Sequence, residues 1–283
     1  MSNEKPSISV VIATYNYLNS LKLCLASLER QSFTNFEILI ADDGSGPEVG
    51  DWLKLYRQET PFAIFHLWQE DQGFRKCRIL NRAILESRGE YIVFLDADCI
   101  LAKNFLQHHW QHREEGRYLG GRRVMINRNI AETVTMEMVQ RGLFDHISLW
   151  ALFHTVFGRI KYLEEALPIL HRLRPNHPFN LLGCNFSIFK QDILAVNGFD
   201  EEYESRGGGE DTDIAFRLEL TGRKMKSVRY LALQYHLGHE KSADKNTSLA
   251  LFKAKASKLI DSERAIQITS IFSHRDRSEP GDP

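Results

Sequence analysis

Acidic residues stand at the ends of several predicted strands, and carboxylates are groups that bind hard divalent cations and move protons. Asp96 and Asp98 directly follow the apolar run YIVFL, so both carboxylates lie on one tight turn. Two such carboxylates can converge on one divalent cation, which prefers oxygen ligands and can bridge the oxygens of a diphosphate. They can also simply cap backbone amides at the end of a strand, so this spacing alone is weak evidence for a site.

Asp42 and Asp43 close another predicted strand and are followed by Gly44. An aspartate at such an edge can accept hydrogen bonds from a base imide or from ribose hydroxyls. The alternative is an Asx turn in which Gly44 has a positive φ, which is common in α/β proteins. Taken alone, this pair favours the turn.

Three glycines, 207–209, precede Glu210 and Asp211, and a helical pattern follows. Glycines allow a backbone to approach a ligand closely, and the start of a helix stabilises negative charge. A carboxylate held there beside a bound sugar can remove a proton from an attacking hydroxyl. The alternative is a flexible loop with an acidic N-cap. Three consecutive glycines are a costly way to build a cap, so the catalytic interpretation is favoured.

His236 and His239 follow an apolar run at a further strand end. A neutral imidazole from either residue could complete a manganese shell beside the carboxylates. Arg75 and Lys76 precede a predicted helix and either face a diphosphate or are ordinary solvated charges. The stretch Trp150–Leu170 is aromatic and amphipathic, and its composition favours a packed helix over a membrane-surface element.

These residues must be positioned by the elements around them. Short β-branched runs alternate with segments of helical periodicity through the first hundred residues, which predicts βαβ units and a mostly parallel sheet. The expected strands cover 8–13, 36–41, 62–68 and 91–95. One expected helix ends near residue 31, and two others cover 52–57 and 78–87. In such sheets ligands bind beyond the carboxyl ends of the strands, where the acidic clusters stand.

The composition excludes several classes of protein. The 283 residues carry 36 Lys+Arg and 37 Asp+Glu, a formal charge of −1, so the basic excess of a nucleic-acid-binding protein is missing. The four cysteines are far apart, which predicts buried free thiols rather than a zinc cluster or a disulfide framework. The N-terminus fits a signal peptide poorly and no apolar run is long enough for a membrane span. We therefore expect a cytoplasmic protein, with peripheral contact at the inner face of the cytoplasmic membrane allowed.

Five motifs in this order resemble a family-2 glycosyltransferase of the GT-A type, over roughly residues 7–240. The motifs are SVVIATYN, FEILIADDGS, EDQGFRKCRILNRAILESRGEYIVFLDAD, GCNFSIFK and NGFDEEYESRGGGEDTDIAFRL. The C-terminal part is similar to the region shared by beta-1,4-galactosyltransferases and chondroitin polymerases. The resemblance implies an α/β, GT-A nucleotide-diphospho-sugar transferase fold, with a mostly parallel central sheet flanked by helices and a helical acceptor-side insertion.

The resemblance also implies a division of the chain. Residues 1–115 correspond to the half that binds the nucleotide sugar, and residues 116–245 to the half of the same domain that binds the acceptor and carries the catalytic elements. Residues 246–283 are expected to form a C-terminal helix and a frayed tail.

Roles for the donor-binding residues follow from the matched motifs. Thr14, Tyr15 and Asn16 match residues that cradle the nucleotide, usually a uridine. Asp43, with Asp42 beside it, matches the aspartate that reads the uracil.

Further donor and metal roles follow in the same way. Arg75 falls where a basic residue lies near the nucleotide. Asp96 matches the residue facing the ribose and metal, and Asp98 matches a direct metal ligand. His236 sits where related enzymes place a further metal ligand, and His239 is the alternative.

On the acceptor side, Asp211 matches the catalytic base and Glu210 the neighbouring sugar contact. Gly208 and Gly209 match the backbone beside the acceptor. Related enzymes often carry an aromatic residue just before this Gly-Gly-Glu-Asp sequence, whereas Gly207 stands there in this chain.

The sequence therefore predicts an inverting glycosyltransferase, a hexosyl- or N-acetylhexosaminyltransferase dependent on Mn²⁺ or Mg²⁺. We expect a nucleotide-sugar donor, favouring UDP, and an acceptor hydroxyl on a glycan or glycolipid such as a lipopolysaccharide or capsule precursor. The alternatives are an inactive module that binds a sugar nucleotide and, less favoured, a nucleotidyltransferase. The segment after the first strand lacks the Gly-rich basic loop that a triphosphate requires.

Overall fold

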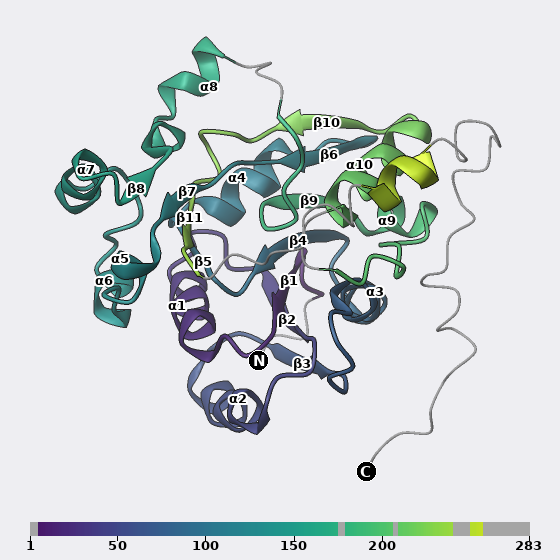
Figure 1. Cartoon of the computed structure of the whole chain (residues 1–283), viewed down its shortest axis with the longest axis horizontal. Coiled ribbons are helices and arrows are strands. Elements are labelled where there is room, and N and C mark those ends of the chain that lie inside the picture. The colour runs from purple at the N-terminus through teal and green to yellow at the C-terminus, as the bar shows by residue number, and fades with distance from the viewer. Residues whose placement is uncertain (1–4, 175–178, 206–208, 240–249, 257–283) are drawn as a thin grey trace.

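The computed structural model describes residues 5–174, 179–205, 209–239 and 250–256, and its centre is a seven-stranded sheet (Figure 1). In spatial order the strands are β10 (Lys224–Ser227), β6 (Arg117–Gly120), β9 (Phe186–Phe189), β4 (Tyr91–Asp96), β1 (Ile8–Thr14), β2 (Phe36–Asp42) and β3 (Ile64–Trp68). Strands β1 to β4 pair in parallel, as do β6 and β10. Strand β9 runs antiparallel to both β4 and β6. The predicted mostly parallel sheet is thus confirmed.

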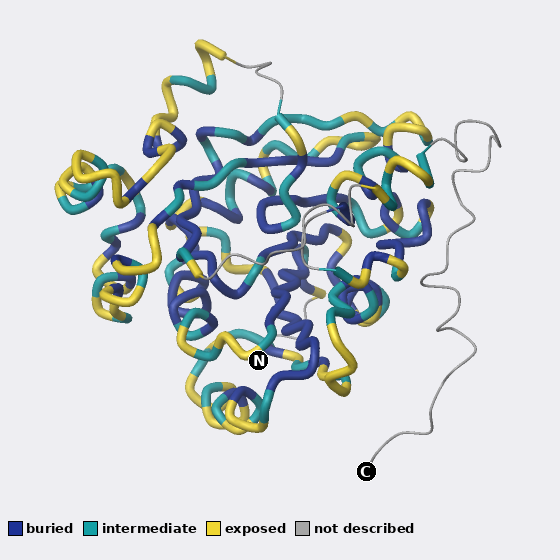
Figure 2. The backbone as a smooth tube through the Cα atoms, in the orientation of Figure 1, coloured by how far each residue is buried: buried dark blue, intermediate teal, exposed yellow. Residues whose placement is uncertain are grey.

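Helices cover both faces of this sheet because its strands alternate side chains between two cores. Val10 and Ile12 of β1 belong to one core, and Val11 and Ala13 to the other. The first core includes residues of α1 (Leu18–Glu29), α2 (Pro47–Glu59) and α4 (Phe105–His112), and the second includes residues of α3 (Lys76–Glu86), α9 (Lys190–Ala195) and α10 (Glu210–Leu220). Figure 2 shows the buried chain concentrated between these layers.

The first four strands and three helices confirm the expected alternation, and two of the shifted boundaries are helix starts. Helix α2 begins at Pro47, five residues before the expected start at Trp52, with proline in its first turn. Helix α3 begins at Lys76 rather than Arg78, which places Lys76 in its first turn. The four cysteines are free and buried, as predicted.

A second sheet joins distant segments beside the carboxyl end of β4. Its order is β5 (Cys99–Leu101), β11 (Gln234–Leu237), β7 (Val124–Ile126) and β8 (Ile160–Lys161). Strand β11 pairs with β5 so that His236 lies opposite Cys99. The second sheet therefore brings the histidine segment next to the turn that carries Asp98.

Between Met125 and Arg174 the chain is built from short elements instead of one long helix. They are α5 (Arg128–Ala131), α6 (Met136–Gln140), α7 (Leu149–Val156), the 3₁₀ helix η1 (Leu163–Ala166) and α8 (Ile169–Leu173). The expected packed helix over Trp150–Leu170 is wrong. Helix α7 ends at Val156, because Gly158 adopts a left-handed φ of 67° and the chain then turns into β8.

The two predicted halves of the domain contribute strands to the same central sheet. Of the expected C-terminal helix and tail, residues 250–256 are helical, and Leu251 and Phe252 pack against the second core. The remainder of 246–283 lies outside the described residues.

Candidate active site

The loops that follow β1 and β2 are tied to each other. The Asn16 backbone N–H donates to Ser45 Oγ at 2.8 Å, and Asn16 Oδ1 accepts from the Gly46 N–H at 3.0 Å. Asn16 has a φ of 56°, a left-handed conformation that asparagine tolerates. Thr14 is buried, and its Oγ1 has no hydrogen-bond partner within the described structure. The predicted contact of Thr14 with the donor stays a prediction, and this unpaired buried oxygen is consistent with it.

Asp43 lies at the same edge and is held from two sides. Asp43 Oδ1 accepts from Gln69 Nε2 at 2.6 Å, and Oδ2 accepts from the Arg75 backbone N–H at 2.8 Å. Burial raises the pKa of Asp43, although these two hydrogen bonds act in the opposite direction. Tyr15 OH donates to Asp71 Oδ2 at 2.8 Å. Each Asp43 oxygen retains a second acceptor position, so this carboxylate can still receive a hydrogen bond from a base.

Asp42 has partners within the protein for both of its oxygens, and its predicted contact with the donor stays a prediction. It is fully buried; its Oδ1 accepts from the Ser45 N–H at 2.8 Å and its Oδ2 lies 2.8 Å from His66 Nε2. The carboxylate thus shapes the turn after β2, in which Gly44 has a φ of 95°. A Cβ on Gly44 would lie 2.6 Å from Asp71 Cα, so only glycine fits there. For Arg75, the structure places the backbone against Asp43, and its side-chain contact with a nucleotide stays a prediction.

Asp98, His236 and His239 form a compact set of ligand atoms that lie within 4.8 Å of one another. Asp98 Oδ2 is 3.4 Å from His236 Nε2 and 3.2 Å from His239 Nε2. Burial lowers the pKa of His236, which favours the neutral imidazole that metals bind. Burial alone would raise the pKa of Asp98, but the two histidines and Arg123 outweigh it and lower that pKa.

This donor set fits a divalent cation. One carboxylate oxygen and two imidazole nitrogens at this spacing match the ligands of first-row metals, whereas Mg²⁺ prefers oxygen ligands and water. His236 is buried on β11, and His239 is more exposed and lies two residues beyond the end of that strand. The sequence left a choice between the two histidines; the structure brings both to Asp98.

Asp96 is paired with a lysine that the site prediction did not select. Lys76 Nζ donates to Asp96 Oδ1 at 2.7 Å. Burial would lower the pKa of Lys76, but the charges of Asp96, Glu210 and Asp211 outweigh it and hold that pKa well above its usual value. The sequence carries no local signal that separates Lys76 from Arg75; the structure places Lys76 in the first turn of α3 and Arg75 at its N-cap.

Asp211 stands in the first turn of α10, close to the Lys76–Asp96 pair. Asp211 Oδ2 accepts from the Gly183 N–H at 2.8 Å, and a Cβ on Gly183 would lie 2.3 Å from Asp211 Oδ1. Burial, followed by the charge of Glu210, raises the pKa of Asp211 to about 7, while Lys76 opposes the rise. A carboxyl with this pKa is about half ionised at neutral pH and suited to general acid–base chemistry.

Glu210 is buried beside this carboxyl. Its Oε2 accepts from the Gly209 N–H at 3.0 Å. Gly209 has an extended φ of 178°, which any residue can adopt. The predicted acceptor contact at Gly208 lies outside the described residues, as does Gly207.

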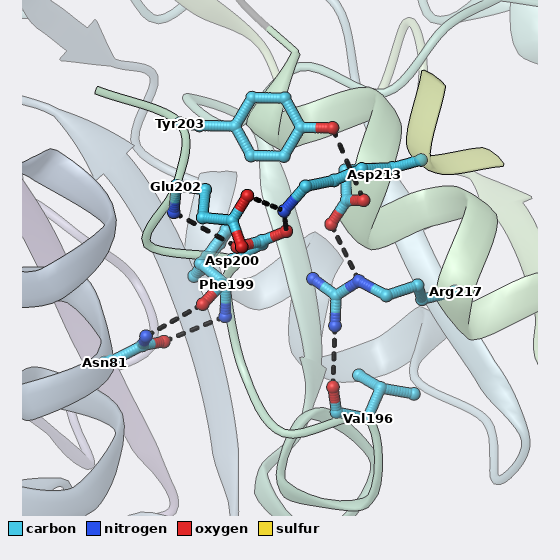
Figure 3. Close-up of polar contacts among 9 residues, drawn as sticks. Asn81, Val196, Phe199, Asp200, Glu202, Tyr203, Asp213 and Arg217 are labelled. Atoms are coloured by element: carbon cyan, nitrogen blue, oxygen red, sulfur yellow. Dashed lines mark hydrogen bonds and ion pairs between the residues drawn. The ribbon is translucent and has the colours of Figure 1, made fainter. Parts of the chain in front are cut away.

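Figure 3 shows the buried Asp213–Arg217 ion pair within α10 and the hydrogen bonds that join both residues to the segment 196–203. Arg217 is fully buried; its Nε donates to Asp213 Oδ2 at 2.7 Å and its Nη1 donates to the Val196 carbonyl at 2.6 Å. Tyr203 OH donates to the other Asp213 oxygen at 3.5 Å. Helix α10, and with it Asp211, is therefore joined to the segment 196–203.

The same segment is joined to α3. Asn81 Nδ2 donates to the Phe199 carbonyl and Asn81 Oδ1 accepts from the Phe199 N–H, both at 2.8 Å. Lys255 pairs with Asp200 and, at 2.8 Å, with Glu202. The contacts of Figure 3 thus set the position of α10 relative to α3, and hence of Asp211 relative to Lys76.

A mostly parallel sheet, a metal-fitting turn after β4 and a carboxylate at the start of α10 define a glycosyltransferase of the GT-A type. A family profile described as "Glycosyl transferase family 2" matches residues 9–177, and one described as "N-terminal domain of galactosyltransferase" matches residues 170–240. The chain belongs to glycosyl transferase family 2.

Curated relatives are similar over most of this chain. It is 26% identical to the chondroitin synthase of Escherichia coli over 88% of the chain, and 26% identical to the validoxylamine A glucosyltransferase of Streptomyces hygroscopicus subsp. jinggangensis over 86%. It spans only 38% of the length of the first and 58% of the second.

Solved structures confirm the fold. Staphylococcus aureus TarS residues 1–349 in complex with UDP-GlcNAc has a TM-score of 0.59 at 18% identity, covering 95% of this chain and 69% of that one. The mannosyltransferase PcManGT from Pyrobaculum calidifontis, in complex with GDP-Man and Mn²⁺, has a TM-score of 0.53 at 15% identity, covering 99% of this chain and 67% of that one. In the part of this chain that the structure describes, no helix has the length and apolar character needed to cross a bilayer.

Proposed function

We propose that this protein transfers a sugar, with inversion, from a nucleotide-diphosphate donor to a hydroxyl of a glycan or glycolipid. The observation that carries this proposal is the placement of Asp211, with a pKa of about 7, beside the Lys76–Asp96 pair. A base at the start of α10 can deprotonate the acceptor hydroxyl, which then attacks the anomeric carbon opposite the leaving diphosphate. A single displacement of this kind inverts the configuration at that carbon.

The donor end of the site lies beyond β1 and β2. The unpartnered Thr14 Oγ1 and the acceptor positions left on Asp43 suit the imide and hydroxyl groups of a uridine. The UDP-GlcNAc complex of TarS supports a UDP-sugar, and the name chondroitin synthase on two relatives supports a polysaccharide product. A lipopolysaccharide or capsule precursor is therefore the acceptor that we propose.

Asp98, His236 and His239 would hold the divalent cation. Bound there, it would neutralise the donor diphosphate and the departing nucleotide. Two imidazoles among three protein ligands favour Mn²⁺ over Mg²⁺. Asp98 is kept ionised for this purpose by the neighbouring histidines, and Lys76 keeps Asp96 paired on the side nearer the base.

The test combines a binding panel with one substitution. Thermal shift with UDP-, GDP- and dTDP-sugars, each with and without Mn²⁺, should single out one nucleotide, because stabilisation follows ligand affinity. Asp211→Asn retains an oxygen that can accept the Gly183 N–H, so the loop should stay in place. It should lower transfer by about 10²–10⁴-fold and leave donor affinity unchanged.

Two results would count against the proposal. A donor that binds but is neither hydrolysed nor transferred by the parent protein would indicate a binding module. A nucleoside triphosphate that stabilises the protein more than any sugar nucleotide would indicate a nucleotidyltransferase.

A further inference from the structure

An apolar surface lies on the segment 149–173, which contributes none of the residues assigned to transfer. Of the fourteen large hydrophobic side chains that are exposed within the described structure, nine lie in this one segment. They are Leu149, Leu152, Phe153, Val156, Phe157, Tyr162, Leu167, Ile169 and Leu173, hereafter the apolar patch. Leu149 is 85% exposed and Val156 82%. So many exposed apolar side chains in one segment mark a surface that meets a partner.

Cations accompany the apolar patch. The exposed charged residues between 149 and 174 are Arg159, Lys161, Arg172 and Arg174 against one anion, Glu164. The other acidic residue of the segment, Glu165, is buried and paired with Arg229. The Arg159 guanidinium lies 5.5 Å from the centre of the Phe157 ring. Aliphatic and aromatic side chains flanked by Lys and Arg are the composition of elements that lie at the surface of anionic membranes.

The fold presents this segment at the edge of the molecule. Helices α7 and α8 lie on the same side, away from α3 and α10, and their outer turns are largely exposed (Figures 1 and 2). Strand β8, which follows α7, pairs with β7, and β7 pairs with β11, which carries His236. At the usual spacing of strands, the β8 strand is about 10 Å from β11. The patch and the metal-ligand set are therefore attached to one small sheet.

From these observations we infer that the apolar patch docks the protein on an anionic lipid bilayer. A second copy of the chain is a poorer occupant, because a symmetric contact through this patch would bring four cations against four. A bilayer of anionic lipids accepts both components: the apolar side chains enter the headgroup boundary and the cations meet lipid phosphates. The inference concerns a surface and does not depend on the proposed transfer reaction.

The experiment is sedimentation of the full chain with sucrose-loaded vesicles, either phosphatidylcholine alone or phosphatidylcholine with 30% phosphatidylglycerol. The parent should bind the anionic vesicles and bind neutral ones far more weakly. The variant Leu152→Ser, Phe153→Ser, Val156→Ser should lose at least tenfold in partitioning, since binding scales with the apolar area inserted. A matched control, Leu55→Ser with Phe65→Ser, removes exposed apolar side chains from other elements and should bind like the parent.

The charge component has its own pair of variants. Arg159→Gln with Lys161→Gln should weaken binding by about fivefold for each charge removed, and added salt should produce a similar loss. Lys54→Gln with Lys224→Gln is the control, because both lysines are exposed on other elements.

Three results would overturn the inference: equal binding to neutral and anionic vesicles, an apolar-patch variant that binds like the parent, or a parent dimer that the apolar-patch variant dissociates. Thermal melts and donor hydrolysis of each variant in solution show that the fold and the catalytic site are intact. A loss of vesicle binding with donor hydrolysis retained supports the docking surface alone and leaves the proposed function to its own test.

Discussion

Lys76 is the residue whose removal best tests the electrostatics of the site. Its ammonium donates to Asp96 at 2.7 Å and lies in the field of Glu210 and Asp211. Lys76→Met keeps most of the apolar stem but removes the positive charge that lowers the Asp211 pKa. It also leaves the Asp96 charge unpaired, and that charge raises the pKa of Asp211 further.

The size of the effect follows from the pairing. A nearby opposite charge typically lowers a carboxyl pKa by about one to three units, so its loss should raise the Asp211 pKa above its value of about 7. With a rise of about one to two units, the ionised fraction at pH 7 falls roughly 5- to 50-fold. A general base acts only when ionised, so kcat/KM at pH 7 should fall by the same factor and recover as the pH rises.

The assay is the pH dependence of kcat/KM for transfer or donor hydrolysis between pH 5.5 and 9.5. The acidic limb of the profile should move to higher pH in Lys76→Met. Arg82→Met is the matched control: Arg82 is on the same helix, is half exposed and pairs with Glu86 instead, so its profile should match that of the parent. A Lys76→Met profile lowered equally at every pH would refute the reasoning, because it would assign Lys76 to donor binding.

Three further predictions concern the base, the metal ligands and the support of α10. Gly183→Ala should lower transfer at least a hundredfold with donor binding retained, because its Cβ would lie 2.3 Å from Asp211 Oδ1; normal activity would show that the base can move. His236→Ala and His239→Ala should each weaken Mn²⁺ binding, measured by the EPR signal of free Mn²⁺, by more than about tenfold; an effect of only one would reduce the set to a single histidine. Arg217→Met should lower the free energy of urea unfolding by about 3–5 kcal/mol, because it leaves a buried aspartate without its cation; a smaller loss would mean that water reaches that aspartate.

Some features of the site were predictable because they depend on local sequence. The buried strands β1, β2 and β4 were predicted directly from apolar runs that contain β-branched residues. Parallel strands bring their carboxyl ends to one edge of the sheet. From these two facts the sequence predicted that the residues after β1, β2 and β4 lie close together. The difference between Asp42 and Asp43 was not predictable, since both follow the same strand and only their hydrogen bonds separate them.

For the exposed segment 149–173, the sequence pattern led to a wrong prediction. Its apolar periodicity is typical of a packed helix, yet Ala151 is the only fully buried residue of α7. Periodicity shows that one face of a helix is apolar, but it does not show what covers that face. The covering element is decided by tertiary packing, which the sequence of the helix does not contain.

The sequence by itself determined the strand-helix alternation, the acidic strand ends and the family motifs, because each is written within a few consecutive residues. The tertiary structure alone decided that both histidines meet Asp98, that Lys76 pairs with Asp96, and that Asp211 has a pKa of about 7. These outcomes depend on β11 pairing with β5 and on α10 being held to α3 through Arg217 and Asn81. Burial and charge act through space between segments that can lie more than a hundred residues apart, as Asp98 and His236 do, and no spacing along the chain records them.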